Sequence, residues 1–529
     1  MELARLEELV GQLVRIGAAL ASERDLRVLL EMIVDELRRF TRADGGTLFL
    51  VDEAAGCLRW AIIQNDALGV RVGGSGGEAV DEAVFAPLPM EQGQRVHAAV
   101  HVALTGEPVN IADVYDRHDD FDFTGPMRFD EAQGYRTRSM LVVPVAHFEG
   151  GVVGVLQLIN AQDADGALVP FSARFEALTT SLAAQAAVAI KNAQLVGELE
   201  AQFEAFIRMI AAAIDAKSPY TAGHVRRVEG LAMRLARAVA EDEGVYGHVR
   251  FDEAQLKELS VAAWMHDVGK IATPEHVVDK ATKLHALTDR IERVRVRYAL
   301  LAEQARTAEL QRQLDGHAPD PARVAAELDA LDEELSFIER VNAGAEYVPS
   351  EDIARLHAIG QKRWTDARGV SHPRLEPDEI RHLRVTRGTL TDEERDVIRD
   401  HARISIEMLE HLPFSSHLKD VPAIAGAHHE KLNGQGYPRG LTGEQLSLRA
   451  RILAVADIVE ALTAADRPYK KPMAVSDVHR ILGFMVRDDE LDGELVRFAM
   501  RAGVLDAYVE DEVAEAQRDA AFAALEAKG

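Results

Sequence analysis

The chain has 529 residues, a length typical of several domains rather than one. Apolar residues make up 47% of it and charged residues 28%, a balance that excludes a disordered or fibrous chain. Its formal net charge of −27 means that most of the surface repels nucleic acid and anionic lipid, so an anionic ligand needs a local cationic site.

The first 190 residues predict an α+β domain built on an antiparallel sheet. Residues 1–40 have the apolar spacing of helix. Two apolar runs on either side of a turn at 52–56 predict a hairpin, and further strands are expected at 139–145 and 152–159.

Residues 175–214 predict a long connecting helix. Their apolar residues alternate at three and four positions, and Gln185 and Asn192 occupy two positions of this seam. A narrow stripe of this length is typical of a two-stranded coiled coil, which would make the protein a homodimer. The alternative is a helix that packs on its own domain.

Beyond residue 211 the sequence predicts helices throughout. We interpret 215–283 and 386–529 as one all-α domain, and 284–385 as a helical insertion whose alternating charges form a solvated face. The expected fold class is therefore multidomain: an α+β domain with an antiparallel sheet, a long connecting helix, and an all-α domain that carries an insertion.

The cysteine content limits which bonds and metal sites the chain can form, and the apolar runs limit where in the cell we expect the protein. The single cysteine, Cys57, excludes an intrachain disulfide and a thiolate zinc cluster. No apolar run approaches the roughly 20 residues of a membrane span, and the first residues predict an acidic amphipathic helix rather than a signal peptide. We therefore expect a cytoplasmic protein with neither membrane nor nucleic acid as a partner.

Histidine and aspartate gather in four short blocks of the all-α domain. In chain order these residues are His224, His266, Asp267, His401, His428, His429 and Asp457. Imidazole nitrogen and carboxylate oxygen suit divalent Fe, Mn, Co, Ni or Zn. One carboxylate can bridge two such ions about 3.5–4 Å apart, and a water held between them loses a proton near neutral pH. The set therefore predicts metal-assisted phosphodiester hydrolysis.

Each block alone is a weak signal, because short motifs recur by chance and a histidine on a helix is usually structural. Asp457 is more informative, since an ionised carboxylate in an apolar segment is costly unless it is paired or metal-bound. The four blocks together favour a metal site over the structural interpretation.

The same blocks resemble the HD-GYP phosphodiesterases, a branch of the HD hydrolase superfamily. The matching stretches are Tyr220–Val228, His266–Ile271, 390–401, His428–Pro438 and 451–470. This resemblance implies an all-helical fold, iron or manganese ions, and hydrolysis of cyclic di-GMP. By motif position it implies as metal ligands His224, His266, Asp267, His401, His428, His429 and Asp457.

The resemblance also implies roles in catalysis and substrate binding. Asp267 and Lys270 would be catalytic, with Lys270 in contact with the scissile phosphate. Arg467 and Lys470 would hold the other phosphate or a guanine, and Tyr437, in the Gly-Tyr-Pro turn, would shape the pocket.

Two departures from the family pattern refine this expectation. Trinuclear members carry a glutamate four residues before the first histidine, where this chain has Tyr220. We therefore expect two divalent metal ions, Fe or Mn, and pGpG rather than GMP as the product. The segment 284–385 matches no catalytic motif.

The N-terminal region resembles a GAF sensor domain over about residues 20–190, through the stretches 46–51, 129–144 and 151–160. GAF domains bind cyclic nucleotides or other small effectors, or pair with each other, so the resemblance implies a regulatory ligand of unknown identity. A chromophore on Cys57 is one option, although a buried cysteine in a strand is usually inert packing.

The combined expectation is a metal-dependent cyclic di-GMP phosphodiesterase regulated by a GAF domain. One alternative is a catalytically silent cyclic-dinucleotide receptor whose Gly-Tyr-Pro face binds proteins, which predicts gaps in the ligand set. The other is an HD hydrolase of a different cyclic dinucleotide, which product analysis would distinguish.

Overall fold

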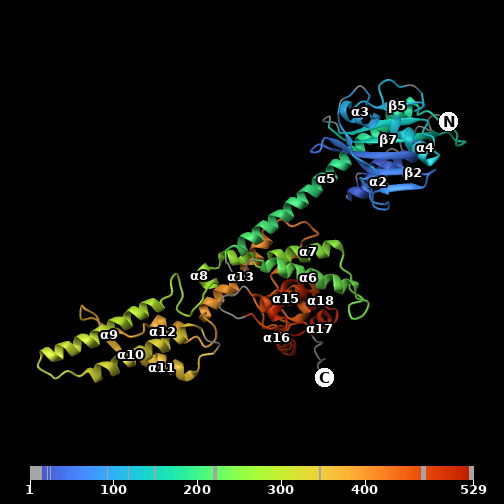
Figure 1. Cartoon of the computed structure of the whole chain (residues 1–529). Helices are drawn as coiled ribbons and strands as arrows, with labels where there is room; N and C mark the ends of the chain where they lie inside the picture. Colours follow the sequence, from blue (N-terminus) through green and yellow to red (C-terminus); the bar gives the residue numbers. More distant parts are fainter. Residues whose placement is uncertain are drawn as a thin grey trace. The chain divides into compact units, whose positions relative to one another are not determined.

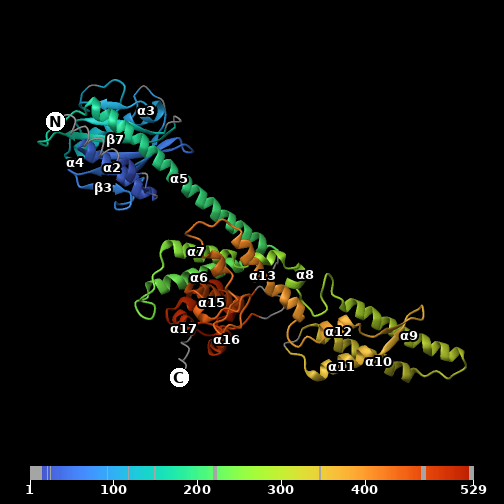
Figure 2. The same cartoon turned by 180° about the vertical axis from the view of Figure 1, so that it is seen from behind.

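Figure 1 and Figure 2 show the protein as a computed structural model of the full chain. The chain divides into two compact units, Met1–Phe203 and Glu204–Gly529. Among the described residues no helix combines the length and apolarity needed to cross a membrane. The structure describes residues 15–20, 22–23, 25–91, 93, 95–116, 118–147, 151–217, 223–344, 347–465 and 472–522.

The first unit is built on an eight-stranded antiparallel sheet of order β3-β2-β1-β7-β6-β5, with β4 paired to β2 and β8 to β7. The predicted hairpin is confirmed, since Asp52 pairs with Cys57 across its turn, and so are the two later strands, β6 and β7. The strands are β1 (Ala43–Asp52), β2 (Cys57–Asn65), β3 (Val70–Gly73), β4 (Leu88–Pro89), β5 (Val109–Ile111), β6 (Met140–Ala146), β7 (Val152–Gln162) and β8 (Leu168–Val169).

Helices cover both faces of this sheet. They are α2 (Leu26–Thr41), α3 (Ala98–Thr105), α4 (Thr124–Gln133) and the first part of α5 (Ala173–Asp215). Successive residues of a strand point to opposite faces. Leu48 accordingly packs with Ile33 of α2 and Leu182 of α5, whereas Phe49 packs with Val102 of α3 in a second cluster.

The helical prediction for residues 1–40 corresponds to two helical segments rather than one. Residues 1–14 lie outside the described residues, residues 15–20 are helical, and α2 starts anew at Leu26. The Asp25 side chain explains the new start, because it accepts hydrogen bonds from the backbone N–H groups of Arg27 and Val28. Such a cap satisfies donors that the first turn of a helix leaves free.

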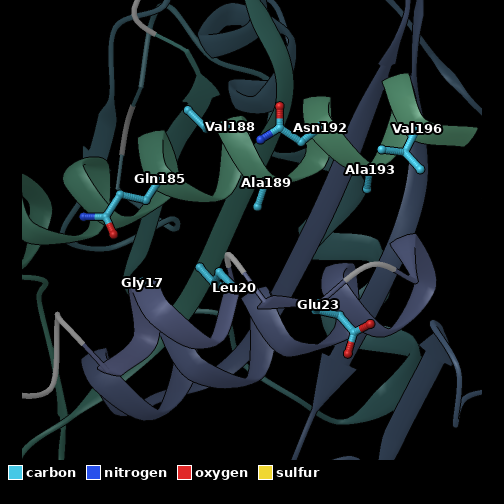
Figure 3. Close-up of a pocket in the computed structure, with 9 residues that line it drawn as sticks. All are labelled: Gly17, Leu20, Glu23, Gln185, Val188, Ala189, Asn192, Ala193 and Val196. Carbon is cyan, nitrogen blue, oxygen red and sulfur yellow. The ribbon is translucent and has the colours of Figure 1, made fainter. Parts of the chain in front are cut away.

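The predicted long helix is confirmed as α5, which has 43 residues. Its first part packs on its own unit. Gln185 and Asn192 are among the residues that line a groove of about 660 Å³, together with Gly17 and Leu20 (Figure 3). Gln185 lies against Gly17 of the same unit, as the alternative interpretation expected, whereas the Asn192 side chain is exposed.

The second unit is mostly helical around one apolar core. Representative core residues are Ile214 of α5, Leu235 of α6, Leu259 of α7 and Leu453 of α15. Outside the inserted segment its elements are α6 (His224–Glu241), α7 (Glu253–Met265), η1 (Val268–Ala272), α8 (Glu275–Val278), α13 (Asp392–Glu410), α14 (Val421–Ala425), η2 (Gly443–Gln445), α15 (Leu448–Thr463), α16 (Val475–Arg487), α17 (Gly493–Arg501), α18 (Val504–Glu512) and η3 (Glu515–Gln517).

The segment between α8 and α13 has an apolar cluster of its own, which includes Tyr298, Phe337 and Leu356. Figure 1 shows α9 and α10 side by side, and the two helices are in contact. Its elements are α9 (Ile291–Leu314), α10 (Pro321–Asn342), α11 (Ser350–Gln361), β9 (Arg363–Thr365), β10 (Ser371–Pro373) and α12 (Pro377–Leu383).

Two expectations for this segment are wrong in part. The strands β9 and β10 form an antiparallel hairpin where only helices were expected, because the Asp366 carboxylate accepts hydrogen bonds from the Arg368 and Val370 N–H groups and closes a turn. Strands of three residues are too short to show an alternating pattern. The charged face is not wholly solvated either, since Glu334 and Glu379 are buried.

Candidate metal centre

The structure brings together every predicted metal ligand. His224 is the first residue of α6, His266 directly follows α7, and Asp267 precedes η1. His401 lies in α13 and Asp457 in α15. With His428 and His429 they form three overlapping groups whose ligand atoms lie within 4.8 Å of one another: His224–His266–Asp457, His266–Asp267–His428 and His401–His428–His429.

The first side of the centre consists of His224, His266 and Asp457. The Oδ1 atom of Asp457 lies 3.4 Å from Nε2 of His224 and 3.8 Å from Nε2 of His266. Oδ2 of Asp267 lies 3.5 Å and 3.2 Å from the same two nitrogens. Two imidazoles and two carboxylates therefore converge on one point.

The second side consists of His401, His428 and His429. The Nε2 atoms of His401 and His428 are 3.4 Å apart, and the ring centroids of His401 and His429 are 5.1 Å apart. The other oxygen of Asp267, Oδ1, lies 3.2 Å from Nε2 of His401 and 3.9 Å from Nε2 of His428. The carboxylate of Asp267 thus turns one oxygen to each side, which is the arrangement of a bridging ligand.

Backbone carbonyls orient the imidazoles. Nδ1 of His266 donates to the Ala263 oxygen at 2.7 Å, and Nδ1 of His428 donates to the Ala425 oxygen at 2.6 Å. His401 makes the same contact with Ile398. Because a carbonyl only accepts, each Nδ1 carries a proton, and in the neutral form of each imidazole Nε2 presents a lone pair to the centre.

Two atoms of the centre are buried without a hydrogen-bond partner, Nε2 of His266 and Oδ1 of Asp267. A buried polar atom without a partner is costly, and both of these atoms face other electron-pair donors. Divalent cations at the two sides would satisfy them. The residues therefore fit a pair of divalent metal ions bound by nitrogen and oxygen.

The electrostatics of the centre keep its acids ionised. Burial would raise the pKa of Asp457, but the hydrogen bond from His224 and the neighbouring imidazoles hold that pKa below its ordinary value. The pKa of Asp267 is likewise lowered against burial, by Lys270 and His266. Burial lowers the pKa of His429 to about 4, so its imidazole is neutral at pH 7, the form that binds metal.

Two glycines allow close approaches around the centre. A Cβ on Gly269 would lie 2.0 Å from the His401 carbonyl oxygen, so only glycine lets η1 pack on α13. The Ser405 hydroxyl stabilises the same packing, since it accepts from the Gly269 N–H at 2.9 Å and donates to the His266 carbonyl at 2.8 Å. A Cβ on Gly436 would lie 2.4 Å from Cα of Glu430.

The predicted substrate residues fall into two groups. Nζ of Lys270 donates to Oδ2 of Asp267 at 2.6 Å, and the Tyr437 ring lies on His429 with centroids 4.7 Å apart, so both border the centre. Arg467 and Lys470 lie outside the described residues, as does Tyr220.

Sequence analysis missed Glu460. This residue follows Asp457 by one helical turn in α15 and is 1% exposed. One of its oxygens contacts Nδ1 of His224, and the other accepts from Nε of Arg227 at 2.8 Å. Glu460 therefore orients His224. In the sequence, Glu460 could have been recognised as a second acidic residue, three positions after Asp457 in the same apolar stretch.

Comparison with known families agrees with this geometry. Residues 25–190 match the GAF domain family, and residues 221–334 and 374–495 each match an HD domain family. The chain therefore contains a GAF domain followed by an HD domain, and the gap between the two HD matches, residues 335–373, begins within α10 and ends with β10. HD domains are metal-dependent, and the His/Asp groups above all lie within the matched stretches.

Several curated relatives match the HD region. One is 3'3'-cGAMP-specific phosphodiesterase 3 of Vibrio cholerae, 34% identical over 160 residues, which are 30% of this chain and 30% of the relative. Another is the cyclic di-GMP phosphodiesterase response regulator RpfG of Xanthomonas campestris, 45% identical over 84 residues, or 16% of this chain and 22% of the relative. The match thus spans less than a third of the length of each relative.

Among solved structures, the GAF domain of a phosphoenolpyruvate-protein phosphotransferase from Coxiella burnetii is 18% identical, with a TM-score of 0.27. The match covers 36% of this chain and 96% of that domain.

Proposed function

We propose that the HD domain hydrolyses a phosphodiester bond of a cyclic dinucleotide at a centre of two divalent metal ions. The observation that carries the proposal is the carboxylate of Asp267, whose two oxygens face two separate groups of buried imidazoles. Curated relatives of the same region are phosphodiesterases of cyclic di-GMP or 3'3'-cGAMP, which supports this substrate class.

The predicted metal ligands divide into two groups, one for each ion. One ion would be held by His224, His266 and Asp457, the other by His401, His428 and His429, with Asp267 shared between them. Bound metal would supply Lewis acidity toward the phosphoryl group and lower the pKa of water at the site.

The neighbouring side chains handle charge and position. The partly exposed Lys270 ammonium, beside Asp267, donates to a phosphoryl oxygen as negative charge builds up there. Tyr437 lies against His429 at one wall and orients the substrate. Glu460 holds His224 in the ligand position through its contact with Nδ1.

Within this class we propose cyclic di-GMP as the substrate and pGpG as the product, on the basis of the Gly-Tyr-Pro turn and of the tyrosine at position 220. The second candidate is 3'3'-cGAMP, which is favoured by the name of the Vibrio cholerae relative that matches over 160 residues. Chromatography of the products formed from each dinucleotide separates the two. A silent receptor would require gaps among the ligands, yet every position of the set is filled.

The test uses the full chain, purified without oxygen so that ferrous ions are kept. We expect about two Fe or Mn ions per chain and metal-dependent turnover, both lost in His266→Ala. His357→Ala, in the exposed part of α11, is the matched control and should keep both. Turnover that persists in His266→Ala or after metal removal would refute the proposal.

We also propose that the protein is a homodimer joined along α5 and regulated by a ligand of the GAF domain. Large apolar side chains beyond the groove of Figure 3 are exposed, among them Leu199 at 64% and Phe206 at 61%. A second α5 would cover them. In sedimentation, Phe206→Glu should give monomers while Val296→Glu, an equally exposed site on α9, should not. A monomeric parent chain would contradict the homodimer.

A further inference from the structure

A single lysine caps the segment that carries Lys270. Nζ of Lys217 donates to the carbonyl oxygens of Lys270 at 3.1 Å, Ile271 at 2.5 Å and Thr273 at 2.6 Å. An ammonium group has three N–H donors, so this arrangement uses all of them. Lys217 stands just after α5 and has no part in the sequence motifs of the centre.

These carbonyls lie at the carboxyl end of η1. The last carbonyls of a helix carry partial negative charge, so a cation placed there is stabilising even though the Lys270 carbonyl also accepts from the Thr273 N–H at 3.1 Å. At its other end η1 follows Asp267, and in its middle Gly269 packs on α13. Lys217 therefore closes the free end of a segment whose start and middle are already fixed.

The end of α5 also contacts the start of α6. Oδ2 of Asp215 accepts a hydrogen bond from the Gly223 N–H at 3.2 Å, directly before His224. The last turns of α5 are anchored in the core of the second unit through Ile207 and Ile214. Two side chains at the end of α5 thus hold two stretches of backbone. Asp215 holds the turn before His224, and Lys217 holds the turn after Lys270.

We propose that Lys217 is a positioning residue of the phosphodiesterase, holding Lys270 where its ammonium meets Asp267 and the scissile phosphate. The inference rests on the proposed function and names a residue outside its motifs. Because Lys217 moves with α5, a shift of this helix end would break the three bonds to η1 and withdraw Lys270. A displacement of the end of α5 would therefore lower the rate of phosphodiester hydrolysis through this contact.

The test compares Lys217→Met with Lys257→Met in the full chain. Lys257 is the matched control, because it also joins α5 to the HD fold: it belongs to α7, not to η1, and its Nζ pairs with Glu204 of α5 at 3.3 Å. We expect Lys217→Met to lower kcat about 10- to 100-fold while metal content stays unchanged. Lys257→Met should stay near the parent, and Lys217→Arg, which keeps N–H donors, should recover most of the loss.

A double-mutant cycle separates positioning from general stability. If Lys217 acts through Lys270, then Lys217→Met should have little further effect in a Lys270→Met background. Equal losses in both backgrounds would overturn the inference and leave the proposed function standing.

Hydrogen exchange gives a readout that does not depend on activity. The amides of Lys270 and Thr273 bond to the carbonyls of Asp267 and Lys270 within η1. Both should exchange faster in Lys217→Met than in Lys257→Met. Unchanged exchange over 268–273 would refute the capping contact, whether or not the parent chain hydrolyses cyclic dinucleotides.

Discussion

The metal centre and the inserted α9–α12 region both bury charged side chains, but they satisfy them in different ways. In the insertion each buried acid meets cations of the chain: Glu334 contacts Lys362 and accepts from Arg374 at 2.8 Å, and Glu379 accepts from Arg297 at 2.8 Å. Such pairs are complete in themselves and serve packing.

In the centre, electron-pair donors face one another instead. Oδ1 of Asp267 and Nε2 of His266 are buried with no hydrogen-bond partner, and Nε2 of His401 lies 3.4 Å from Nε2 of His428. This arrangement is costly unless cations stand between the groups. Burial of charge alone therefore does not mark a functional site, whereas several electron-pair donors that converge on one another do.

The largest expected effect is at Asp267. Asp267→Asn removes the charge shared by both sides, so we expect turnover to fall about 10³-fold or more and bound metal to drop below one ion per chain. Kinetics and elemental analysis measure the two. Asp396→Asn, an exposed change on the same helix as His401, should alter neither. Full activity in Asp267→Asn would show that the buried carboxylate of the centre does not hold metal, and the centre would then not differ from the insertion in this respect.

In the insertion, Glu334→Ala should cost stability rather than chemistry. It leaves Arg374, 20% exposed, and Lys362, 49% exposed, without their partner. Because solvent reaches both cations, we expect a loss of about 3 kcal/mol, the lower end of the cost of breaking a buried pair. Denaturant unfolding measures this loss, and metal content should stay unchanged. Glu333→Ala, whose side chain is 74% exposed, should cost under about 1 kcal/mol. Equal costs at both positions would contradict a structural role for Glu334.

At the base of the insertion, Lys283 predicts a pH effect. Burial lowers its pKa to about 8, and among the described residues its ammonium donates to the carbonyls of Leu383 and Val385. The unfolded chain, with an ordinary lysine pKa near 10.4, holds this proton more tightly. Stability should therefore rise as pH increases from about 8 to about 10.4, by up to roughly 3 kcal/mol.

Lys283→Met should lose this part of the pH slope. Urea unfolding at pH 8 and pH 10 measures the slope in the parent and the variant. Parallel slopes in the two proteins would show that the lysine does not titrate in this range.

A smaller effect is expected at Glu460, which touches the centre only through His224. Glu460→Gln keeps the shape and removes the charge, so metal affinity or turnover should fall about 10- to 100-fold. Metal titration of the chelated protein measures affinity. Asp506→Asn, an acid elsewhere in this unit, is the control. A variant with parent affinity would show that the charge of Glu460 is not needed to keep His224 in place.

Much of the fold and of the site could be predicted from sequence. Two apolar runs on either side of a turn indicated the β1–β2 hairpin, and a long apolar spacing indicated α5. The motif blocks located the imidazoles and carboxylates, because their types and order are local properties. Glu460 and Lys217 escaped prediction, since each acts through a contact with a segment far away in the chain.

The sequence by itself determined which side chains were available for a metal centre and where the β1–β2 hairpin and α5 lie, because periodicity and motifs depend on neighbours in the chain. Only the tertiary structure decided that Asp267 turns one oxygen to each side and that Gln185 faces its own unit. The physical reason is that such contacts depend on how helices pack, and packing is set by the whole core rather than by any one segment.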